Sequence, residues 1–323
     1  MRAIVASSET PALTDLPMPS PGQDEVLVRV RANSLNRADL MMLKGSYHGG
    51  LRGMNFPLGL EWAGELVEVG AAVEGWRVGD RVMAGGLGAF AEYAIGYPPR
   101  MYAVPEGMSF EQAATLPVAL QTMHDAISTN GMLAKGQTVL IQGASSAMGL
   151  MGMQVAKLLG AGKVIGTSTS PERRARLAEF GADVVVDTSA PDWVAQVQSA
   201  SGGEGVDLLI DLLAGPLMNG NLQATRIGCR MVNVGRMAGN SGEFNFDLHS
   251  LRRITYVGVT FRTRSPEDVE EVVARTTRAL GPALAGGALR MPIDKVYRFE
   301  EAAQAFERMG QNQHFGKIVL VSA

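Results

Sequence analysis

Hydrophobic positions change their spacing along the chain, and this change separates two kinds of region. In the first third, short apolar stretches end at glycines, and the segments 25–33, 63–69 and 78–83 predict strands. Ser109, three residues before Gln112, predicts the start of a short helix. We therefore expect the first third of the chain to be rich in short strands.

From about residue 137 the pattern changes to alternating strands and helices. Unbroken apolar runs are typical of parallel strands that are buried on both faces. Such runs predict strands at 138–142, 163–167, 184–186, 206–211, 230–235 and 254–260. Ser170 and Ser265, each followed by Pro and an acidic residue, mark helix starts, and Gly181 marks a helix end. A helix over 300–309 and a strand over 317–321 complete the pattern.

This order of elements predicts an α/β fold with two domains. Residues 121–260 form a doubly wound parallel-sheet domain, and residues 1–120 and 261–323 together form a strand-rich second domain. A length of 323 residues agrees with two domains.

Composition narrows the classes of function. The formal net charge of -3 argues against a nucleic-acid-binding protein, which usually carries a basic excess. Cys229 is the one cysteine, so neither an intrachain disulfide nor a cysteine-based zinc lobe is available, and a cytoplasmic location is expected. The charge-free stretch 136–156 has the length of a membrane span. Its three glutamines and its glycines favour a strand, a loop and a helix instead, and we expect no membrane association.

The loop after the strand at 138–142 is a candidate phosphate-binding loop. It begins at Gly143 and ends at Gly149, with Ser146 where a dinucleotide-binding motif usually has its middle glycine. Backbone N–H groups of such a loop, together with a helix N-terminus, bind a pyrophosphate. The Ser146 side chain either crowds the phosphate or donates a hydrogen bond to it. The alternative is a strand-to-helix turn that simply requires small residues.

The end of the second strand of this region indicates which dinucleotide is preferred. A carboxylate here would favour NADH. Instead the chain has Ser168 and Thr169, followed by Arg173 and Arg174, and hydroxyls with a guanidinium suit the 2′-phosphate of NADPH. We therefore predict NADPH as cofactor. The alternative is that both arginines lie on an ordinary solvated helix face.

Seven segments in this order resemble the quinone oxidoreductase branch of the medium-chain dehydrogenase/reductase superfamily. They are VRVRANSLNRADLMMLKGSY (28–47), GLEWAGELVEVG (59–70), VGDRV (78–82), AATLPVALQT (113–122), the loop over 139–149, EFGAD (179–183) and HFGKIVL (314–320). The resemblance implies a GroES-like catalytic domain with a Rossmann domain inserted before its C-terminal portion. It also implies a homodimer that pairs through the strand at 254–260.

Zinc alcohol dehydrogenases share that fold, but the residues depart from their metal site. Asn36 stands where the zinc-binding Cys would be, and Leu60 stands where the His would be, beside a retained Glu61. Asn, Leu and one Glu do not make a tetrahedral zinc site, so we expect no catalytic metal.

The resemblance implies hydride transfer from NADPH to a quinone or another α,β-unsaturated carbonyl compound. An enoyl-thioester (enoyl-CoA) reductase is the alternative within this class. An NADPH-binding regulatory or partner-binding protein with little catalysis is the alternative from another class.

The resemblance also assigns candidate catalytic residues. Asn36 and Asp39 match a family segment beside the nicotinamide, and Tyr47 matches a proton donor of enoyl-thioester reductases. Helix capping is the alternative role for Asn36 and Asp39, and Tyr47 is otherwise part of a pocket wall. Glu61 is expected to brace the floor of the active site. The expected cofactor-binding residues are Asn36, Thr122, Gly143, Ser145, Ser146, Ala147, Met148, Gly149, Ser168, Thr169, Arg173, Gly235, Arg262 and Lys317.

Overall fold

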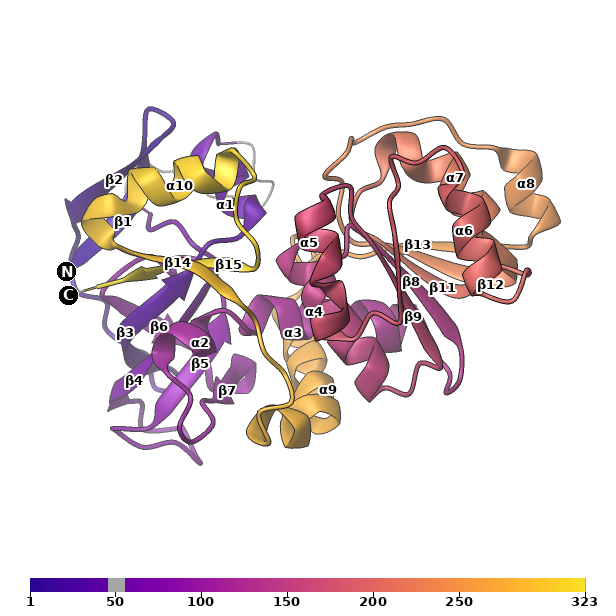
Figure 1. Ribbon diagram of the computed structural model, residues 1–323. Coiled ribbons are helices and arrows are strands. Elements are labelled where there is room, and N and C mark those ends of the chain that lie inside the picture. The colour runs from indigo at the N-terminus through magenta and orange to yellow at the C-terminus, as the bar shows by residue number, and fades with distance from the viewer. Residues whose placement is uncertain (46–55, 323) are drawn as a thin grey trace. The chain divides into compact units, whose positions relative to one another are not determined.

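The chain folds into two compact units (Figure 1). The computed structural model describes residues 1–45 and 56–322. Unit 1 consists of Met1–Val118 and Arg262–Ala323, and unit 2 of Ala119–Phe261. The expected range for the parallel-sheet domain, 121–260, differs from unit 2 by two residues at its start and one at its end.

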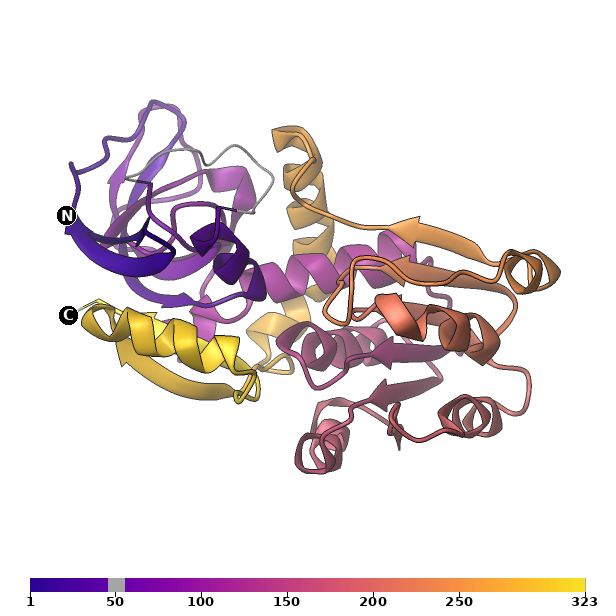
Figure 2. The same ribbon diagram turned by 90° about the horizontal axis from the view of Figure 1, so that it is seen from above.

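Unit 2 is built on a six-stranded parallel sheet. Its strands are β8 (Thr138–Gln142), β9 (Lys163–Thr167), β10 (Val184–Val186), β11 (Val206–Asp211), β12 (Thr225–Asn233) and β13 (Thr255–Gly258). They lie in the order β10-β9-β8-β11-β12-β13, which leaves β13 at one edge (Figure 2). This is the doubly wound order 3-2-1-4-5-6, and the expected parallel-sheet domain is confirmed. The order reverses between β8 and β11, and dinucleotides bind at such a reversal, beyond the carboxyl ends of the strands.

Helices cover both faces of this sheet because its strands are apolar on both sides. The helical segments of unit 2 are α3 (Pro117–His124, which begins in unit 1), a π-helical turn (Asp125–Asn130), α4 (Ala147–Leu158), α5 (Pro171–Ala175), a 3-10 turn (Leu177–Phe180), α6 (Trp193–Ala200), a second 3-10 turn (Gly215–Leu217), α7 (Met218–Ala224) and α8 (Phe246–Leu251). Leu140 and Leu209 pack in one core with Trp193 of α6 and Leu222 of α7. Ile141, next along β8, points to the opposite face, where α4 lies.

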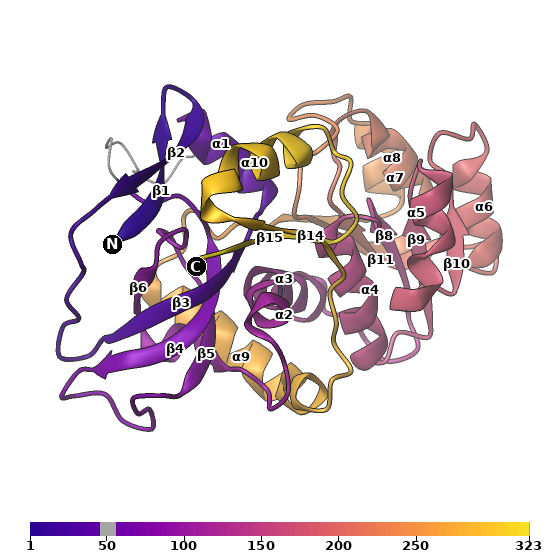
Figure 3. The same cartoon turned by 60° about the vertical axis from the view of Figure 1, so that its left-hand side comes forward.

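Unit 1 contains a seven-stranded sheet in which distant parts of the chain pair (Figure 3). Its strands are β3 (Val26–Ser34), β4 (Glu61–Val69), β5 (Arg81–Gly85), β6 (Tyr93–Gly96), β7 (Met101–Ala103), β14 (Ile293–Arg298) and β15 (Lys317–Val321). The main order is β14-β15-β3-β4-β5-β7, and β6 also pairs with β3. Strand β15 therefore inserts next to β3 although nearly 300 residues separate them, and this position brings Lys317 into the interior.

A close approach of two chain segments fixes where β15 begins. The Lys317 N–H donates to the Pro292 carbonyl oxygen over 2.9 Å. Gly316 has a φ of +89°, and a Cβ atom built there would lie 2.0 Å from the same oxygen. Only glycine combines this conformation with this contact.

A hairpin and four further helices complete the described part of unit 1. They are β1 (Arg2–Ser7), β2 (Thr10–Asp15), α1 (Arg37–Leu43), α2 (Phe110–Ala114), α9 (Pro266–Ala285) and α10 (Ala302–Gly310), with 3-10 turns at Pro98–Arg100 and Phe299–Glu301. The predicted caps are present: Ser109 accepts from the Gln112 N–H, and Ser265 forms a capping box with Asp268.

The strand predicted at 78–83 begins later than expected. Asp80 accepts a hydrogen bond from the Arg77 N–H over 2.9 Å, and Gly79 has a φ of +92°. These two features form a turn, so β5 starts only at Arg81. No helix in the described part of the chain is long and apolar enough to cross a membrane.

Candidate active site

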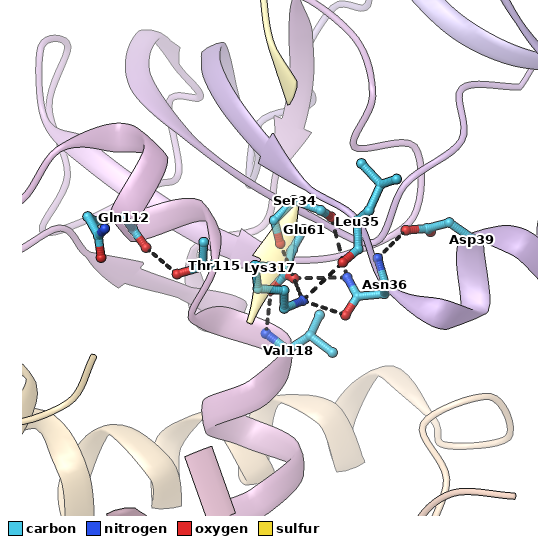
Figure 4. Close-up of polar contacts among 9 residues, drawn as sticks. All are labelled: Ser34, Leu35, Asn36, Asp39, Glu61, Gln112, Thr115, Val118 and Lys317. Carbon is cyan, nitrogen blue, oxygen red and sulfur yellow. Dashed lines mark hydrogen bonds and ion pairs between the residues drawn. The ribbon is translucent and has the colours of Figure 1, made fainter. Parts of the chain in front are cut away.

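A buried carboxylate, Glu61, lies at the centre of a polar cluster in unit 1 (Figure 4). Glu61 opens β4 and has no exposed surface. Its Oε1 atom accepts hydrogen bonds from Ser34 Oγ at 2.5 Å and from Asn36 Nδ2 at 2.8 Å, and it pairs with the Lys317 ammonium. Its Oε2 atom accepts from the Val118 N–H at 2.9 Å. One carboxylate thus ties together β3, β15 and the start of α3.

Lys317 is held by partners that occupy its whole ammonium group. Its side chain is 2% exposed. Besides Glu61, its Nζ donates to Asn36 Oδ1 at 2.7 Å and to the Leu35 carbonyl oxygen at 3.4 Å. An ammonium has three N–H groups, so all three have acceptors inside unit 1. A direct contact with a cofactor, as the resemblance implies, would require Lys317 to give up one of these bonds.

The Asn36 amide is oriented by this ion pair. Its Oδ1 accepts from Lys317, while its Nδ2 donates to Glu61 and makes a long bond of 3.5 Å to the Ser34 carbonyl oxygen. Asn36 is also the residue before α1, so the helix-capping alternative describes its backbone position. The cap itself comes from Asp39, whose Oδ2 accepts from the Asn36 N–H at 2.6 Å.

Asp39 is a carboxyl group whose proton affinity is raised by its position. Burial, with a smaller contribution from the negative charge of Glu61, raises the pKa of Asp39 to about 7, although the Asn36 N–H and the Lys317 charge oppose the shift. Among the described residues, its Oδ1 has no hydrogen-bond partner. Asp39 is therefore able to bind and release a proton near neutral pH. Tyr47, the expected proton donor, lies outside the described residues.

The cluster does not fit a catalytic zinc ion. Asn36 is the residue at the position of the expected Cys, and its amide is bonded to Glu61 and Lys317. Leu60 has no donor atom, and Glu61 already compensates a lysine cation. Within the described ranges, no three His, Cys, Asp or Glu side chains come together as a metal site. These residues supply neither the donors nor the geometry that zinc requires.

In unit 2, the candidate phosphate loop joins β8 to the N-terminus of α4. Gly143 has a φ of +74°. Gly149 leaves no space for a side chain, because an added Cβ would lie 2.4 Å from Ala144 Cα. The N–H groups of Ala147 and Met148 belong to the first helical turn, where a helix offers them no carbonyl acceptor. The loop thus has the form of an anion-binding site.

Ser146 has a structural role that the sequence did not suggest. Its hydroxyl accepts from the Gly149 N–H at 3.1 Å and donates to the Gly143 carbonyl oxygen at 2.8 Å. Ser146 is therefore the N-cap of α4 and closes the loop on itself. The glycine that usually occupies position 146 in this motif would have no hydroxyl to accept the Gly149 N–H.

Four buried polar side chains connect the strand ends at the point where the strand order reverses. Thr167 donates to Gln142 Oε1 at 2.8 Å, and Gln142 Nε2 donates to Asn221 Oδ1 at 2.6 Å. Asn221 Nδ2 donates to Asp211 Oδ2 at 3.2 Å, and burial raises the pKa of Asp211. None of these four side chains is exposed to solvent. We did not predict this series of hydrogen bonds from the sequence. Polar residues at the ends of buried strands could have indicated it.

The network shapes the loops on both sides of the reversal. Asp211 Oδ1 accepts from the N–H groups of Leu213 at 2.9 Å and Ala214 at 2.8 Å. Thr167 Oγ1 accepts from the Gly143 N–H at 3.0 Å. Gly235 lies next to this region, and a Cβ there would be 2.5 Å from the Leu212 carbonyl oxygen. Its lack of a side chain is thus explained by packing against the backbone.

At the end of the second strand, the neighbour of the expected Arg173 makes the contacts. Arg174 Nη1 donates to the Ser168 carbonyl oxygen at 2.7 Å and forms an ion pair with Asp187 at 2.9 Å. Ser168 Oγ donates to Ser145 Oγ at 3.0 Å. The Arg173 N–H donates to Ser170 Oγ at 3.3 Å.

The remaining candidates lie in several places. Thr122 and His124 are buried in α3, and Asp125 accepts from Asn130 Nδ2 at 3.0 Å across the π-helical turn. Thr169 is exposed, whereas Arg262, at the start of the second stretch of unit 1, is half-buried. Among the predicted site residues, Lys317 and Glu61 form a direct ion pair.

Breaking the Lys317–Glu61 pair should destabilise unit 1 strongly. Lys317→Met leaves a buried carboxylate without its cation, which costs about 3–5 kcal/mol. Glu61→Gln combined with Lys317→Met removes both charges and should be less destabilising than Lys317→Met alone. Denaturant unfolding measures both variants, with Lys135→Met, at an exposed lysine, as control. Equal losses for the single and double variants would contradict this interpretation.

The raised pKa of Asp39 predicts a pH dependence of stability. The unfolded carboxyl ionises near its ordinary pKa of 3.8, whereas the folded one keeps its proton up to about pH 7. The free energy of unfolding should therefore fall as the pH rises through this window, by at most about 1.4 kcal/mol per pH unit. Denaturant unfolding between about pH 5 and pH 8 should show a smaller slope in Asp39→Asn and an unchanged slope in Asp24→Asn, an exposed control. A slope in Asp39→Asn as steep as that of the wild-type chain would refute this role of Asp39.

Two family models match most of the chain. The model described as "Alcohol dehydrogenase GroES-like domain" matches residues 22–106, and the model described as "Zinc-binding dehydrogenase" matches residues 147–278. The first match confirms the expected GroES-like domain.

Relatives of two kinds align with nearly the whole chain. A quinone oxidoreductase from Rattus norvegicus is 27% identical over 311 residues, which cover 95% of this chain and 92% of that protein. A mycocerosic acid synthase-like polyketide synthase from Mycolicibacterium smegmatis is 29% identical over 93% of this chain, which spans only 14% of the synthase.

A solved structure agrees with these relatives. The crystal structure of an NAD-dependent alcohol dehydrogenase superposes with a TM-score of 0.87 at 28% identity and covers 100% of both chains. The strand order of unit 2, the two matched family models and the relatives lead to the same assignment. The chain belongs to the medium-chain dehydrogenase/reductase superfamily, in its quinone oxidoreductase branch.

Proposed function

We propose that the chain is a zinc-independent, NADPH-dependent reductase of quinones or other α,β-unsaturated carbonyl compounds. The observation that carries this proposal is that the Glu61 carboxylate is paired with a lysine. Lys317 and Asn36 both donate to Glu61, and the neighbouring Leu60 has no atom that could bind a metal. Without a Lewis acid to polarise an alcohol, the favoured acceptor is one that conjugation has already activated. Similarity to quinone oxidoreductases supports the same acceptor class.

The chain's own residues would hold the cofactor and supply the proton. The bound dinucleotide supplies the hydride. The loop 143–149 would bind its pyrophosphate through backbone N–H groups and the N-terminus of α4. Ser146 and Lys317 would act as positioning residues, the first by closing the loop and the second by orienting the Asn36 amide. The other residues proposed for cofactor contacts are Asn36, Thr122, Ser168, Thr169, Arg173, Gly235 and Arg262.

Two groups are proposed to manage the proton that must accompany the hydride. The Tyr47 phenol is protonated at neutral pH and can donate to the reduced acceptor. Asp39, whose pKa burial raises to about 7, can exchange a proton at the same pH. They lie close in sequence, because Asp39 is in the first turn of α1 and Tyr47 follows it by eight residues.

An enoyl-thioester reductase is the second candidate function. The similarity of 93% of this chain to a segment of a polyketide synthase favours it. The match of Tyr47 to a proton donor of enoyl-thioester reductases supports the same candidate.

We also propose a homodimer in which two β13 strands pair. β13 is an edge strand, and Tyr256 is 40% exposed on it. Nearby Ile227, Phe246 and Leu251 are 58%, 75% and 67% exposed, which makes this edge unusually apolar. Light scattering should give the mass of two chains, and a monomer at micromolar concentration would contradict the proposal.

Oxidation of NADPH with three acceptors tests the proposed activity. Turnover is expected with a quinone and a simple enone, and Tyr47→Phe should lower kcat with the enone by about 100-fold. Tyr93→Phe, at a half-buried tyrosine of β6, is the control and should retain activity. Preference for a crotonyl thioester would favour the second candidate. Tight NADPH binding without turnover of any acceptor would instead indicate a regulatory or partner-binding protein.

A further inference from the structure

An ion pair lies at the end of the second strand of unit 2. In dinucleotide-binding sheets, residues at this strand end determine whether NADPH or NADH is preferred. Arg174, in α5, forms this pair with Asp187, which follows β10, over 2.9 Å. The same Nη1 atom donates to the Ser168 carbonyl oxygen, the first residue after β9, at 2.7 Å. In doubly wound sheets this strand end receives the adenosine ribose, where NADPH carries a phosphate and NADH a hydroxyl.

The carboxylate of Asp187 is fixed before any ligand arrives. Its Oδ1 accepts from the Ser189 N–H at 2.9 Å and from Ser189 Oγ at 2.6 Å. These bonds, and to a lesser extent Arg174, hold the pKa of Asp187 below its ordinary value. The group is therefore a permanent negative charge at physiological pH, next to the guanidinium.

Arg174 still has hydrogen-bonding capacity. Both of its interactions use Nη1, and a guanidinium has five N–H groups on three nitrogens. No residue in the described ranges accepts from its Nε or Nη2 atoms. Arg174 and Asp187 are 22% and 26% exposed, so a ligand can reach them.

We propose that Asp187 sets the preference between NADPH and NADH by competing with the 2′-phosphate for Arg174. This inference rests on the proposed dinucleotide binding. Arg174 attracts the phosphate through its N–H groups, whereas Asp187 repels it and neutralises part of the arginine's charge. The same carboxylate can accept a hydrogen bond from the 2′-hydroxyl of NADH. The pair therefore moderates a preference for NADPH that Arg174 alone would make stronger.

Fluorescence titration of the full chain with NADPH and with NADH tests the proposal. Asp187→Asn keeps an acceptor for Arg174 but removes the charge, and it should lower the Kd for NADPH relative to NADH about tenfold, or about 1.4 kcal/mol. Arg174→Met should change the ratio in the opposite direction by at least as much. In the Arg174→Met background, Asp187→Asn should change the ratio less than it does in the wild-type chain, because the competition for Arg174 is gone and only the direct effects of the carboxylate on the ligand remain.

Two further arginine variants complete the design. Arg176→Met, at a partly exposed arginine paired with Glu179, is the matched control and should leave both Kd values unchanged. Arg173→Met tests the rival arginine of the same helix. An unchanged ratio in Asp187→Asn, or a ratio that responds to Arg173→Met but not to Arg174→Met, overturns the inference. Failure of the wild-type chain to bind either dinucleotide overturns the proposed function itself, and thermal unfolding of each variant identifies misfolding.

Discussion

The buried pair of Lys317 and Glu61 is the interaction on which unit 1 depends. Glu61 has no exposed surface and accepts four hydrogen bonds, from Ser34, Asn36, Val118 and Lys317. Burying either charge alone would be costly, so the arrangement is stable only when both are present. The pair consequently fixes the Asn36 amide, the end of β3 and the first turn of α3 in one geometry.

In unit 2, buried hydrogen bonds rather than an ion pair hold the ends of the strands together. The chain from Thr167 through Gln142 and Asn221 to Asp211 links the carboxyl ends of β9, β8 and β11. Because each member is both buried and bonded, the loops at these strand ends are held in defined conformations. A rigid set of loops reduces the entropy lost when a ligand binds there.

The sequence predicted much of the fold because its signals were local. The apolar run at 317–321 matches β15 residue for residue, and Ser170 and Ser265 cap the helices where expected. The late start of β5 depended on a side-chain turn at Asp80, which periodicity does not report.

The site was harder to predict because its geometry depends on distant partners. Gly143 and Gly149 were identifiable from their spacing, whereas the capping role of Ser146 depends on which atoms its hydroxyl reaches. The proposal for Arg174 required the position of Asp187, thirteen residues away from Arg174. No single sequence reveals such a pairing, because it is fixed by how β9 and β10 align.

The interrupted course of unit 1 has a consequence for how the chain acquires its structure during synthesis. Residues 119–261 are contiguous and complete their own sheet, whereas β3 and Glu61 need β15 and Lys317 as neighbours. When the ribosome has made residue 118, the segment that ends there lacks a strand and a counter-charge. The second unit is therefore able to fold before β15 and Lys317 complete the first unit.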